Sequence, residues 1–429
     1  MRFGKLLFLF MYFLGLSHHS DASLSVENMA VEETSLKSSK PEAVGIDGKI
    51  LTEKIDNIVL EAIRERATPG AVVAVIKDNQ VIFEKAYGYH TYENQVETKV
   101  DDIFDLASIS KIAATTLAVM RLSEEGKINL NETLGHYLED SRNTNKANIR
   151  LKDVMLHQAG LIPSIPFHRG LKDNDYSSDS SATYPTKVAD GFYLRENYFD
   201  EEMWPKILNS PTKPSGGYVY SDLSMYLMQK VIERQSEMPL DKYVKDIFYD
   251  SLGMHSTSFN PWKNYPSYRI VPTERDGKSF RDTLLLGFVH DQGAALANGV
   301  AGHAGLFSTA RDLAIYGQLL LNRGSYGGAT FLKSETIDFF TSNQAESSRR
   351  GLGFDRFDPD RSKEYPSRLA STAIYGHTGY TGTCIWIDPE NQLVYIFLSN
   401  RIHPKVSNKL SSLNIRSRIL DAIYEGINE

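Results

Sequence analysis

The 429-residue chain contains a single cysteine, Cys384, so it cannot form an internal disulfide or a cysteine-based zinc site. Its net charge is −7, and no cluster of basic residues occurs, which gives no reason to expect a nucleic acid or an anionic membrane as partner. The histidines show no spacing typical of a metal site, and we expect neither a metal nor a cofactor. The composition, 41% hydrophobic and 24% charged, is typical of a soluble globular protein.

An apolar run lies at the N-terminus. The short basic region MRFGK precedes eleven largely apolar residues, LLFLFMYFLGL, and the polar SHHSDAS follows. This order is typical of a secretory signal peptide, and the run is short for a membrane span. We expect an exported protein, periplasmic or secreted, in which residues 1–22 are the signal peptide; an uncleaved signal anchor is the alternative. Residues 23–44, rich in Ser, Glu and Lys, are expected to be a flexible linker.

Residues 45–429 are expected to form one catalytic domain. Helical spacing of apolar residues begins at Leu51, and the β-rich runs AVVAVIK and VIFEKAYG then predict a hairpin. Near the C-terminus, TGTCIWIDP and LVYIFLSN predict a second hairpin, followed by a helix over 406–427. A mainly helical insert spans about 112–285. We therefore predict an α/β (α+β) fold in which an antiparallel sheet joins both ends of the chain and the N- and C-terminal helices flank it.

One stretch of the insert stands out by its length. Residues 164–191 carry no clear periodic pattern, and they are too many for a plain connector. We expect them to be either a lid or loosely ordered.

Lys111 is an unusual residue for its position. It is the only charge between Asp105 and Arg121, at the start of a predicted apolar helix, where a cation is unfavourable. Residues three apart share a helical face, so its side chain should reach Ser108. Burial and the helix dipole favour the neutral amine, which can take the proton of a serine nucleophile. Without catalysis, Ser108 would be an ordinary helix N-cap.

Two other catalytic arrangements are less well supported. A second Ser-x-x-Lys, Ser210 to Lys213, is followed by Pro-Ser-Gly-Gly, so no helix can hold both side chains on one face. A Ser-His-Asp triad would have to pair His290 and Asp291 with Ser108, but no Gly-x-Ser-x-Gly elbow occurs. The glycine-rich stretch GVAGHAGLFSTARDLA contains His303, which we expect to be structural.

Two further motifs follow along the chain. YVYSDLSMYLMQKVIE places Tyr220 just before a predicted helix, with Asp222 as its N-cap. YGHTGYTGTCIWIDP places His377, Thr378 and Gly379 at the start of a strand, where the glycines let another backbone come close. Each motif also has an ordinary structural explanation, a capped helix in the first case and a hairpin turn in the second.

The three motifs in this order resemble the penicillin-binding protein and class C β-lactamase family, and specifically its esterase-like or peptidase-like branch. The similarity runs from about Pro41 to the C-terminus through PGAVVAVIKD, LASISK, LHQAGL, YSDLSMYL, AGHAGLFSTARDLA and GHTGYTGT. The resemblance implies a sheet with a helical subdomain. It also implies Ser108 as the acylated nucleophile, with Lys111 and Tyr220 moving its proton.

The resemblance assigns the remaining site residues as well. Asp222 would occupy the polar position of the second motif, and His377, Thr378 and Gly379 would line the cleft along a strand. The backbone N–H groups of Ser108 and Tyr380 would form the oxyanion hole.

Two positions depart from the β-lactamase pattern. Asp222 stands where β-lactamases usually carry Asn, and a carboxylate beside Lys111 would hold it protonated and move the base role to Tyr220. His377 stands where they carry Lys, and a neutral histidine binds the carboxylate of a penicillin or a terminal D-alanine less well. No Glu is placed as a dedicated deacylation base, so we expect weak β-lactamase activity at most.

These residues predict an exported serine hydrolase that forms an acyl-enzyme at Ser108. It would cleave an ester or a D-amino-acid amide or peptide bond in a small-molecule or peptidoglycan-like substrate. The alternatives are a non-catalytic cell-wall or ligand-binding module on the same fold and a structural scaffold without a cleft. The sequence leaves the oligomeric state open.

Overall fold

The computed structural model describes residues 35–275, 277, 280–345 and 347–428. The signal peptide and most of the linker predicted above fall outside the described residues. No helix within the described part of the chain is long and apolar enough to cross a membrane.

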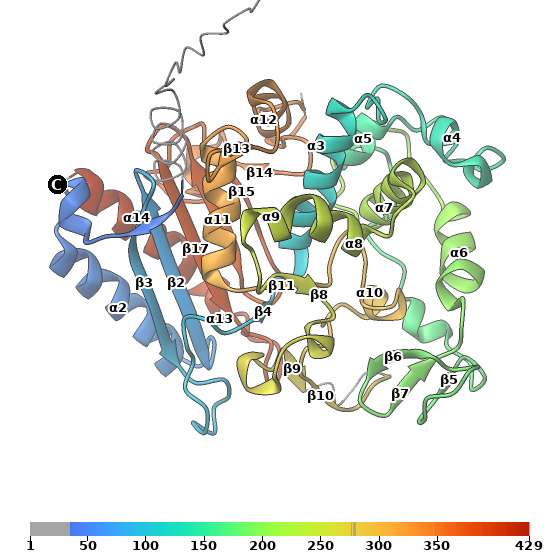
Figure 1. The fold of residues 1–429 in the computed structure, drawn as a ribbon, viewed down its shortest axis with the longest axis horizontal. Helices are drawn as coiled ribbons and strands as arrows, with labels where there is room; N and C mark the ends of the chain where they lie inside the picture. Colours follow the sequence, from blue (N-terminus) through green and yellow to red (C-terminus); the bar gives the residue numbers. More distant parts are fainter. Residues whose placement is uncertain (1–34, 276, 278–279, 346, 429) are drawn as a thin grey trace, which may run out of the picture.

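A seven-stranded sheet built from both ends of the chain forms one side of the molecule (Figure 1). Its order is β1-β3-β2-β17-β16-β15-β14, and all neighbours are antiparallel except β1 and β3. The strands are β1 (Lys37–Ser38), β2 (Gly70–Lys77), β3 (Gln80–Gly88), β14 (Asp355–Arg356), β15 (Tyr375–Thr378), β16 (Cys384–Asp388) and β17 (Leu393–Ser399). Pairing of β2 with β17 confirms that the two predicted hairpins share one sheet.

The tight turn between β2 and β3 follows from its residues. Asp78 and Asn79 both have positive φ, 49° and 65°. Two such residues in a row are typical of the hairpin turns that match the twist of the strands, and Asp and Asn tolerate that conformation.

Helices cover both faces of the sheet. Alternate residues of a strand point to opposite faces. On β2, Val73 and Val75 therefore pack in a core with α2 (Gly48–Arg64) and α14 (Ile415–Asn428). The opposite face of β2 belongs to the larger core, together with α11 (Ala310–Leu321). The predicted flanking by the first and last helices is confirmed.

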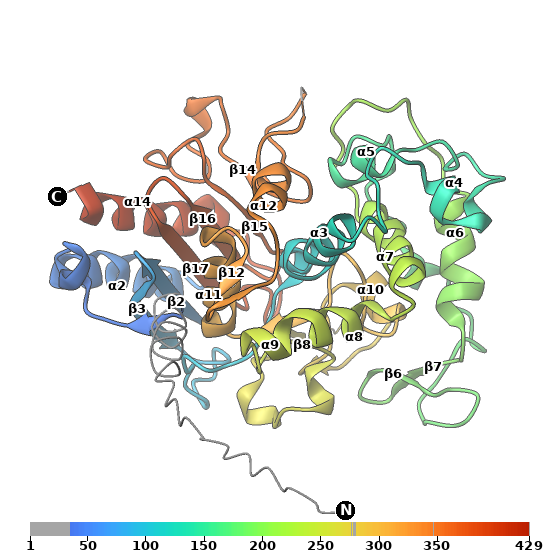
Figure 2. The same ribbon diagram turned by 45° about the horizontal axis from the view of Figure 1, so that its top comes forward.

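The larger core continues from the sheet into the helical region beside it (Figure 2). The other helices are α3 (Leu117–Glu124), α4 (Leu134–Tyr137), α5 (Leu151–Met155), α6 (Trp204–Leu208), α7 (Leu223–Ser236), α8 (Leu240–Val244), α9 (Asp250–Leu252), α10 (Gln292–Leu296), α12 (Ser334–Thr341) and α13 (Lys409–Ser412). The predicted limits of the insert and of the domain stay predictions.

Short strands complete the helical region and its connection to the sheet. The stretch 164–191, for which loose order was one expectation, contributes two strands to a small sheet. The short strands are β4 (Phe104–Asp105), β5 (Tyr176–Ser177), β6 (Thr186–Ala189), β7 (Phe192–Leu194), β8 (Ser258–Phe259), β9 (Glu274–Arg275), β10 (Leu284–Leu285), β11 (Leu306–Ser308), β12 (Ser325–Tyr326) and β13 (Ala329–Thr330). Strand β4 pairs with β11, and it leads directly to Ser108.

Candidate active site

The segment that carries Ser108 is not the regular helix that its sequence predicts. Ala107–Ile109 form a 3₁₀ turn, Lys111–Thr116 form a π-helix, and α3 follows. Ala107 has a φ of 49°, a conformation that costs an alanine about 1–3 kcal/mol. The backbone N–H of Ala107 donates to Asp105 Oδ1 at 2.9 Å, which holds this strained turn in place. Ser108 is left partly exposed at the edge of a cleft.

Lys111 is fully buried, and its ammonium group uses all three of its N–H donors. Nζ lies 2.9 Å from Ser108 Oγ, 2.9 Å from Asp222 Oδ1 and 3.2 Å from the backbone oxygen of His303. Burial lowers the pKa of Lys111, but Asp222 and Tyr220 outweigh it and raise the pKa above its ordinary value. Lys111 is therefore a charged donor to Ser108 rather than the neutral amine that burial alone would favour.

Tyr220 lines the same cleft as Ser108, and His157 holds it there. The backbone N–H of Val219 donates to the His157 oxygen at 2.9 Å, and the N–H of Ser221 donates to His157 Nδ1 at 3.3 Å. The ring centroids of His157 and Tyr220 lie 4.7 Å apart, and the Tyr220 centroid is 4.8 Å from Lys111 Nζ. His157 thus fixes the backbone on both sides of Tyr220.

Asp222 stands at the N-cap position of α7, but its side chain makes no capping hydrogen bond. The predicted capping role is therefore wrong. Its backbone is already helical, with φ −71° and ψ −27°, so the carboxylate cannot fold back onto the first turn as an N-cap does. The carboxylate instead pairs with Lys111, with its side chain only 26% exposed.

The strand motif lies beside the Ser108 turn because Gly379 has no side chain. A Cβ on Gly379 would lie 2.4 Å from the backbone oxygen of Leu106 and 2.1 Å from Thr383 Oγ1. Thr381 Oγ1 also donates to the Asp105 oxygen at 2.7 Å. The close approach that the glycines predict is therefore to the chain's own backbone, and it sets the distance between the strand end and Ser108.

His377 is buried and neutral. Its Nδ1 lies 2.7 Å from the Thr378 oxygen, and its Nε2 lies 3.3 Å from Arg350 Nη1. Nδ1–H therefore donates, and Nε2 accepts from the guanidinium. Burial, reinforced by Arg350 and Lys111, lowers the pKa of His377 to about 3. The Arg350 guanidinium thus lies beside His377, and His377 occupies the position at which the resemblance would place a lysine.

Four arginines line the cleft of about 410 Å³ that contains Ser108. Two of them, Arg349 and Arg350, are balanced by two buried acids: Asp355 lies 2.7 Å from Arg349 and 3.5 Å from Arg350, and Asp358 lies 2.8 Å from Arg349. Burial raises the pKa of Asp355, but the two arginines outweigh it and lower the pKa to about 2. This part of the cleft carries little net charge.

The other two arginines have no acidic partner within the described ranges. Arg401 Nε donates to the Tyr380 oxygen at 2.7 Å, and Arg416 Nη1 donates to the Thr383 oxygen at 3.2 Å. Burial lowers the pKa of Arg401; Tyr380 opposes this shift, and Arg416, which lines the same cleft, adds to it. Neither arginine was predicted as a site residue. Arg401 follows β17 and Arg416 lies at the start of α14, and nothing in their sequence context distinguishes them from surface arginines.

Ser108 and Tyr380 both line this cleft. Neither backbone N–H donates a hydrogen bond in a turn or loop of the described residues. The exposed ring of Tyr380 stacks on His290, with the centroids 5.2 Å apart. His290 Nδ1 in turn lies 2.9 Å from Glu274 Oε2, and His290 makes no hydrogen bond to Ser108. The triad alternative therefore has no geometric support.

The second Ser-x-x-Lys pair is not brought together. Ser210 is buried, and its Oγ donates to the Ile207 oxygen at 2.8 Å. Lys213 is exposed in the following loop. The two residues share no hydrogen bond in the part of the chain that the structure describes.

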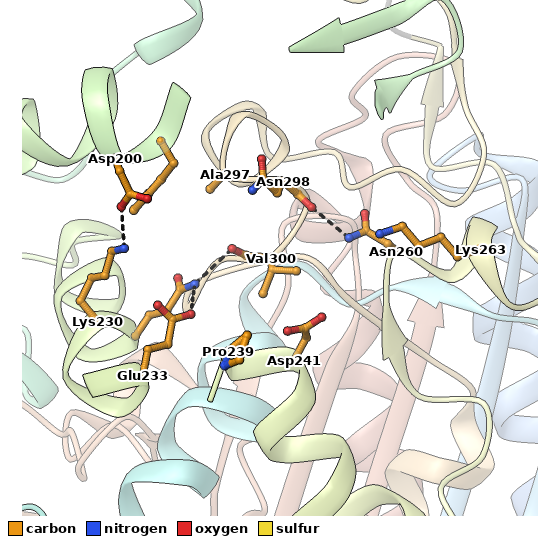
Figure 3. A pocket seen from close by; sticks show the side chains of 12 residues that line it. Asp200, Lys230, Glu233, Pro239, Asp241, Asn260, Lys263, Ala297, Asn298 and Val300 are labelled. Atoms are coloured by element: carbon orange, nitrogen blue, oxygen red, sulfur yellow. Dashed lines mark hydrogen bonds and ion pairs between the residues drawn. The ribbon is translucent and has the colours of Figure 1, made fainter. Parts of the chain in front are cut away.

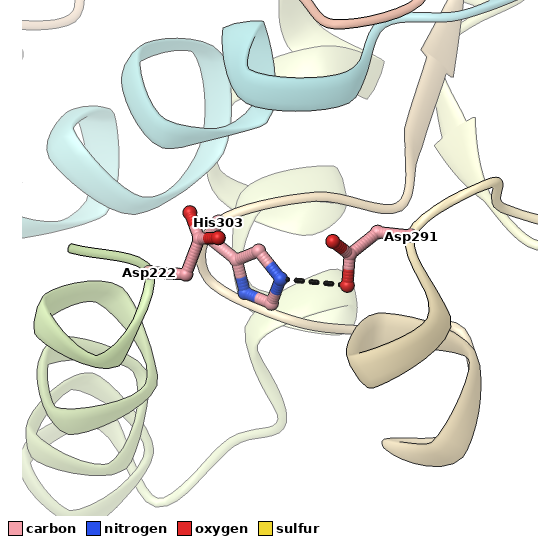
Figure 4. Close-up of side chains that lie close together, drawn as sticks. All are labelled: Asp222, Asp291 and His303. Atoms are coloured by element: carbon pink, nitrogen blue, oxygen red, sulfur yellow. Dashed lines mark hydrogen bonds and ion pairs between the residues drawn. The ribbon is translucent and has the colours of Figure 1, made fainter. Parts of the chain in front are cut away.

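Asp222, Asp291 and His303 form a cluster (Figure 4). Its Asp222 is also the partner of Lys111. One potential ligand atom from each lies within 4.8 Å of the others, so the cluster could hold a cation. The three residues lie far apart in the sequence, and no spacing rule could have found them.

A different pocket, of about 360 Å³, lies between α7, α8 and the loop after α10 (Figure 3). Three of its charged groups have partners: Lys230 Nζ lies 2.7 Å from Asp200 Oδ1, and Gln229 donates to Glu233 at 3.0 Å. No serine or cysteine lines it, so it offers no hydroxyl or thiol nucleophile of those residue types.

Comparisons with known proteins agree on the family. A family model described as Beta-lactamase matches residues 55–418. A curated relative from Salmonella agona (strain SL483), named "Putative D-alanyl-D-alanine carboxypeptidase", is 32% identical over 421 residues and covers 92% of each chain.

Two solved structures share the fold. One is described as EstCE1, a hydrolase with promiscuous acyltransferase activity; its TM-score is 0.65 at 20% identity, over 88% of this chain and 99% of that chain. The other is the octameric penicillin-binding protein homologue from Pyrococcus abyssi, with a TM-score of 0.63 at 21% identity, over 87% and 77% of the chains.

Proposed function

The chain belongs to the β-lactamase family, and from this premise we propose that it is a serine hydrolase that forms an acyl-enzyme at Ser108. The observation that carries the proposal is the 2.9 Å hydrogen bond between Lys111 Nζ and Ser108 Oγ, with Lys111 fixed by Asp222. Burying a charged lysine costs free energy unless its hydrogen-bond partners are well placed. Here the partners of Lys111 hold its ammonium group against Ser108, the one serine that lines the cleft beside Tyr220.

The proposed acylation step uses Tyr220 to move the proton. Ser108 Oγ attacks the carbonyl carbon, and its proton passes to the Tyr220 oxygen while the Tyr220 proton passes to the leaving group. The charge of Lys111 stabilises the serine oxygen as it loses its proton. The backbone N–H groups of Ser108 and Tyr380 receive the negative charge that develops on the carbonyl oxygen. Water then takes the place of the leaving group and reverses these steps.

We also propose that the bond cleaved lies next to a carboxylate. The strand motif alone predicted weak carboxylate binding because His377 is neutral. Arg401 and Arg416, which have no acidic partner within the described residues, supply two positive charges in the same cleft. An arginine fork suits a carboxylate, and the name of the Salmonella relative describes an enzyme that releases a carboxylate-bearing D-amino acid.

Covalent labelling tests the nucleophile. A fluorophosphonate or a fluorescent penicillin should label the wild type and leave Ser108→Ala unlabelled, and equal signals would overturn the assignment. A non-catalytic binding module would neither label nor turn over esters.

A pair of thioesters tests the carboxylate. Their leaving groups should differ only in a carboxylate, mercaptoacetate against ethanethiol. Loss of a charge-assisted hydrogen bond in Arg416→Met should lower kcat/KM about 10- to 100-fold for the mercaptoacetate ester only. The exposed Arg142, changed to Met, is the matched control. An equal fall for both esters would refute carboxylate recognition.

We further propose that the protein acts after export, on a small-molecule or peptidoglycan-like substrate. The support is the order of basic, apolar and polar residues in 1–22. N-terminal sequencing of the protein from the periplasm or medium tests it. A mature chain that begins near Ala22 is expected, and an intact N-terminus in the cytoplasm would contradict export.

A further inference from the structure

Asp222 also borders a second, smaller pocket of about 190 Å³. Polar walls of this pocket come from Asp291, His303 and Tyr226, and apolar walls from Ile165 and Phe167. Because Asp222 touches Lys111 and this pocket, the pocket is one side chain away from the catalytic centre.

His303 presents a bare acceptor to this pocket. Its Nε2 lies 2.9 Å from Asp291 Oδ1, which also accepts from the Ala294 N–H at 2.7 Å. Since a carboxylate only accepts, Nε2 carries the proton, and Nδ1 of a neutral ring is an acceptor. Nδ1 is buried without any hydrogen-bond partner, and His303 is 3% exposed.

Tyr226 gives an independent sign that the pocket takes a ligand. Its hydroxyl is buried without a partner, and the residue is 2% exposed. A Cβ on Gly293 would lie 2.7 Å from this hydroxyl and 3.3 Å from Asp291 Oδ1, so the Tyr226 hydroxyl and the Asp291 oxygen border the same space above Gly293. Buried polar atoms without partners are rare in folded proteins and call for an explanation, such as a bound group.

The free atoms of the pocket match one chemical group. Asp222 and Asp291 each keep one carboxylate oxygen that bonds to no described residue, and His303 Nδ1 is the third acceptor. A primary ammonium has three N–H donors and one positive charge. A divalent metal ion would also fit this donor set, but it would meet twice the repulsion from the Lys111 ammonium, which already lies 2.9 Å from Asp222.

We propose that this pocket binds a primary ammonium group on the acyl part of the substrate. The inference rests on the proposed acyl-enzyme at Ser108. Ser108 Oγ and Asp222 Oδ1 both lie 2.9 Å from Lys111 Nζ, so the serine and the pocket lie on either side of the Lys111–Asp222 pair, and we infer that one substrate contacts both. Together with Arg401 and Arg416, the pocket selects dipolar substrates, with an ammonium in the acyl part and a carboxylate elsewhere.

Two thioesters with the same mercaptoacetate leaving group test this selection. Their acyl groups, 6-aminohexanoyl and heptanoyl, differ only in an ammonium against a methyl group. We expect wild type to favour the ammonium ester in kcat/KM by about tenfold or more. Asp291→Asn and Tyr226→Phe should reduce this ratio by slowing hydrolysis of the ammonium ester. Glu274→Gln, in the separate pair of Glu274 with His290, should keep the wild-type ratio.

The outcomes separate this inference from the proposed function. Heptanoyl hydrolysis that needs Ser108, with no preference for the ammonium ester, overturns the inference alone. Mn²⁺ that alters heptanoyl hydrolysis in wild type but not in Asp291→Asn would assign the pocket to a metal ion and overturn it too.

A binding measurement needs no turnover. Ser108→Ala protein should bind 6-aminohexanoate more tightly than hexanoate, and adding Asp291→Asn should remove the difference. Equal affinities in Ser108→Ala would refute the ammonium site, whatever the result of the hydrolysis assays.

Discussion

His377→Lys places in this chain the lysine that the strand motif of β-lactamases carries, and we expect it to unfold much of the population. Arg350 Nη1 lies 3.3 Å from His377 Nε2. Two unit charges at that separation repel by about 5 kcal/mol at an effective dielectric constant near 20. The pKa of His377, lowered by burial and Arg350 to about 3 from 6.5, gives a similar cost of about 5 kcal/mol for a positive charge there.

That cost is comparable to the whole stability of many domains, about 5–15 kcal/mol. Urea unfolding at pH 7 should therefore show a fall of several kcal/mol in the free energy of unfolding of His377→Lys. Adding Arg350→Met should recover most of it, because the new lysine then replaces the lost guanidinium beside Asp355. The matched control is His290→Lys, which places a lysine next to Glu274. A single variant as stable as wild type, or a double variant no more stable than the single, would refute the charge argument.

Three further predictions follow from the geometry. Tyr220→Phe should lower kcat/KM for a thioester by about 10²–10⁴-fold with Tm unchanged, and a smaller loss would remove Tyr220 from proton transfer. Gly379→Ala should abolish fluorophosphonate labelling of Ser108, since its Cβ would lie 2.4 Å from the Leu106 oxygen; undiminished labelling would contradict this contact. Stability should fall as pH drops from 6.5 toward 3, because the unfolded chain protonates His377 and the folded chain does not. Urea unfolding from pH 7 to 4 should give a shallower fall for His377→Gln, and an identical slope would refute the assignment.

Much of the fold follows from local patterns. The hairpins were predictable because runs rich in β-branched and other apolar residues flank turns such as Asp78-Asn79, whose conformation few other residue types tolerate. The helix from Leu51 shows its buried face at helical spacing. The union of both chain ends in one sheet follows because neither hairpin could cover its apolar faces alone.

In the candidate site, only residues that belong to sequence motifs could be predicted. Ser108 and Lys111 drew attention because a cation begins an apolar helix, although the irregular helix there was not foreseen. Arg401 and Arg416 look like ordinary surface residues in the sequence, since the absence of a partner is a property of three-dimensional packing. His157 lies in a motif that the resemblance includes, but its contacts with the Tyr220 backbone depend on its own φ of 54°.

The pairing of β2 with β17 also determines how late in synthesis the sheet can be completed. Strand β2 is made early, yet its partner along one whole edge is residues 393–399. Until those residues emerge, β2 presents an unpaired apolar edge, the kind of surface that invites aggregation and that chaperones cover. The guanidinium of Arg416 follows later still. A ribosome-bound chain would thus already contain the serine and still have no complete cleft, so activity begins only when synthesis is nearly over.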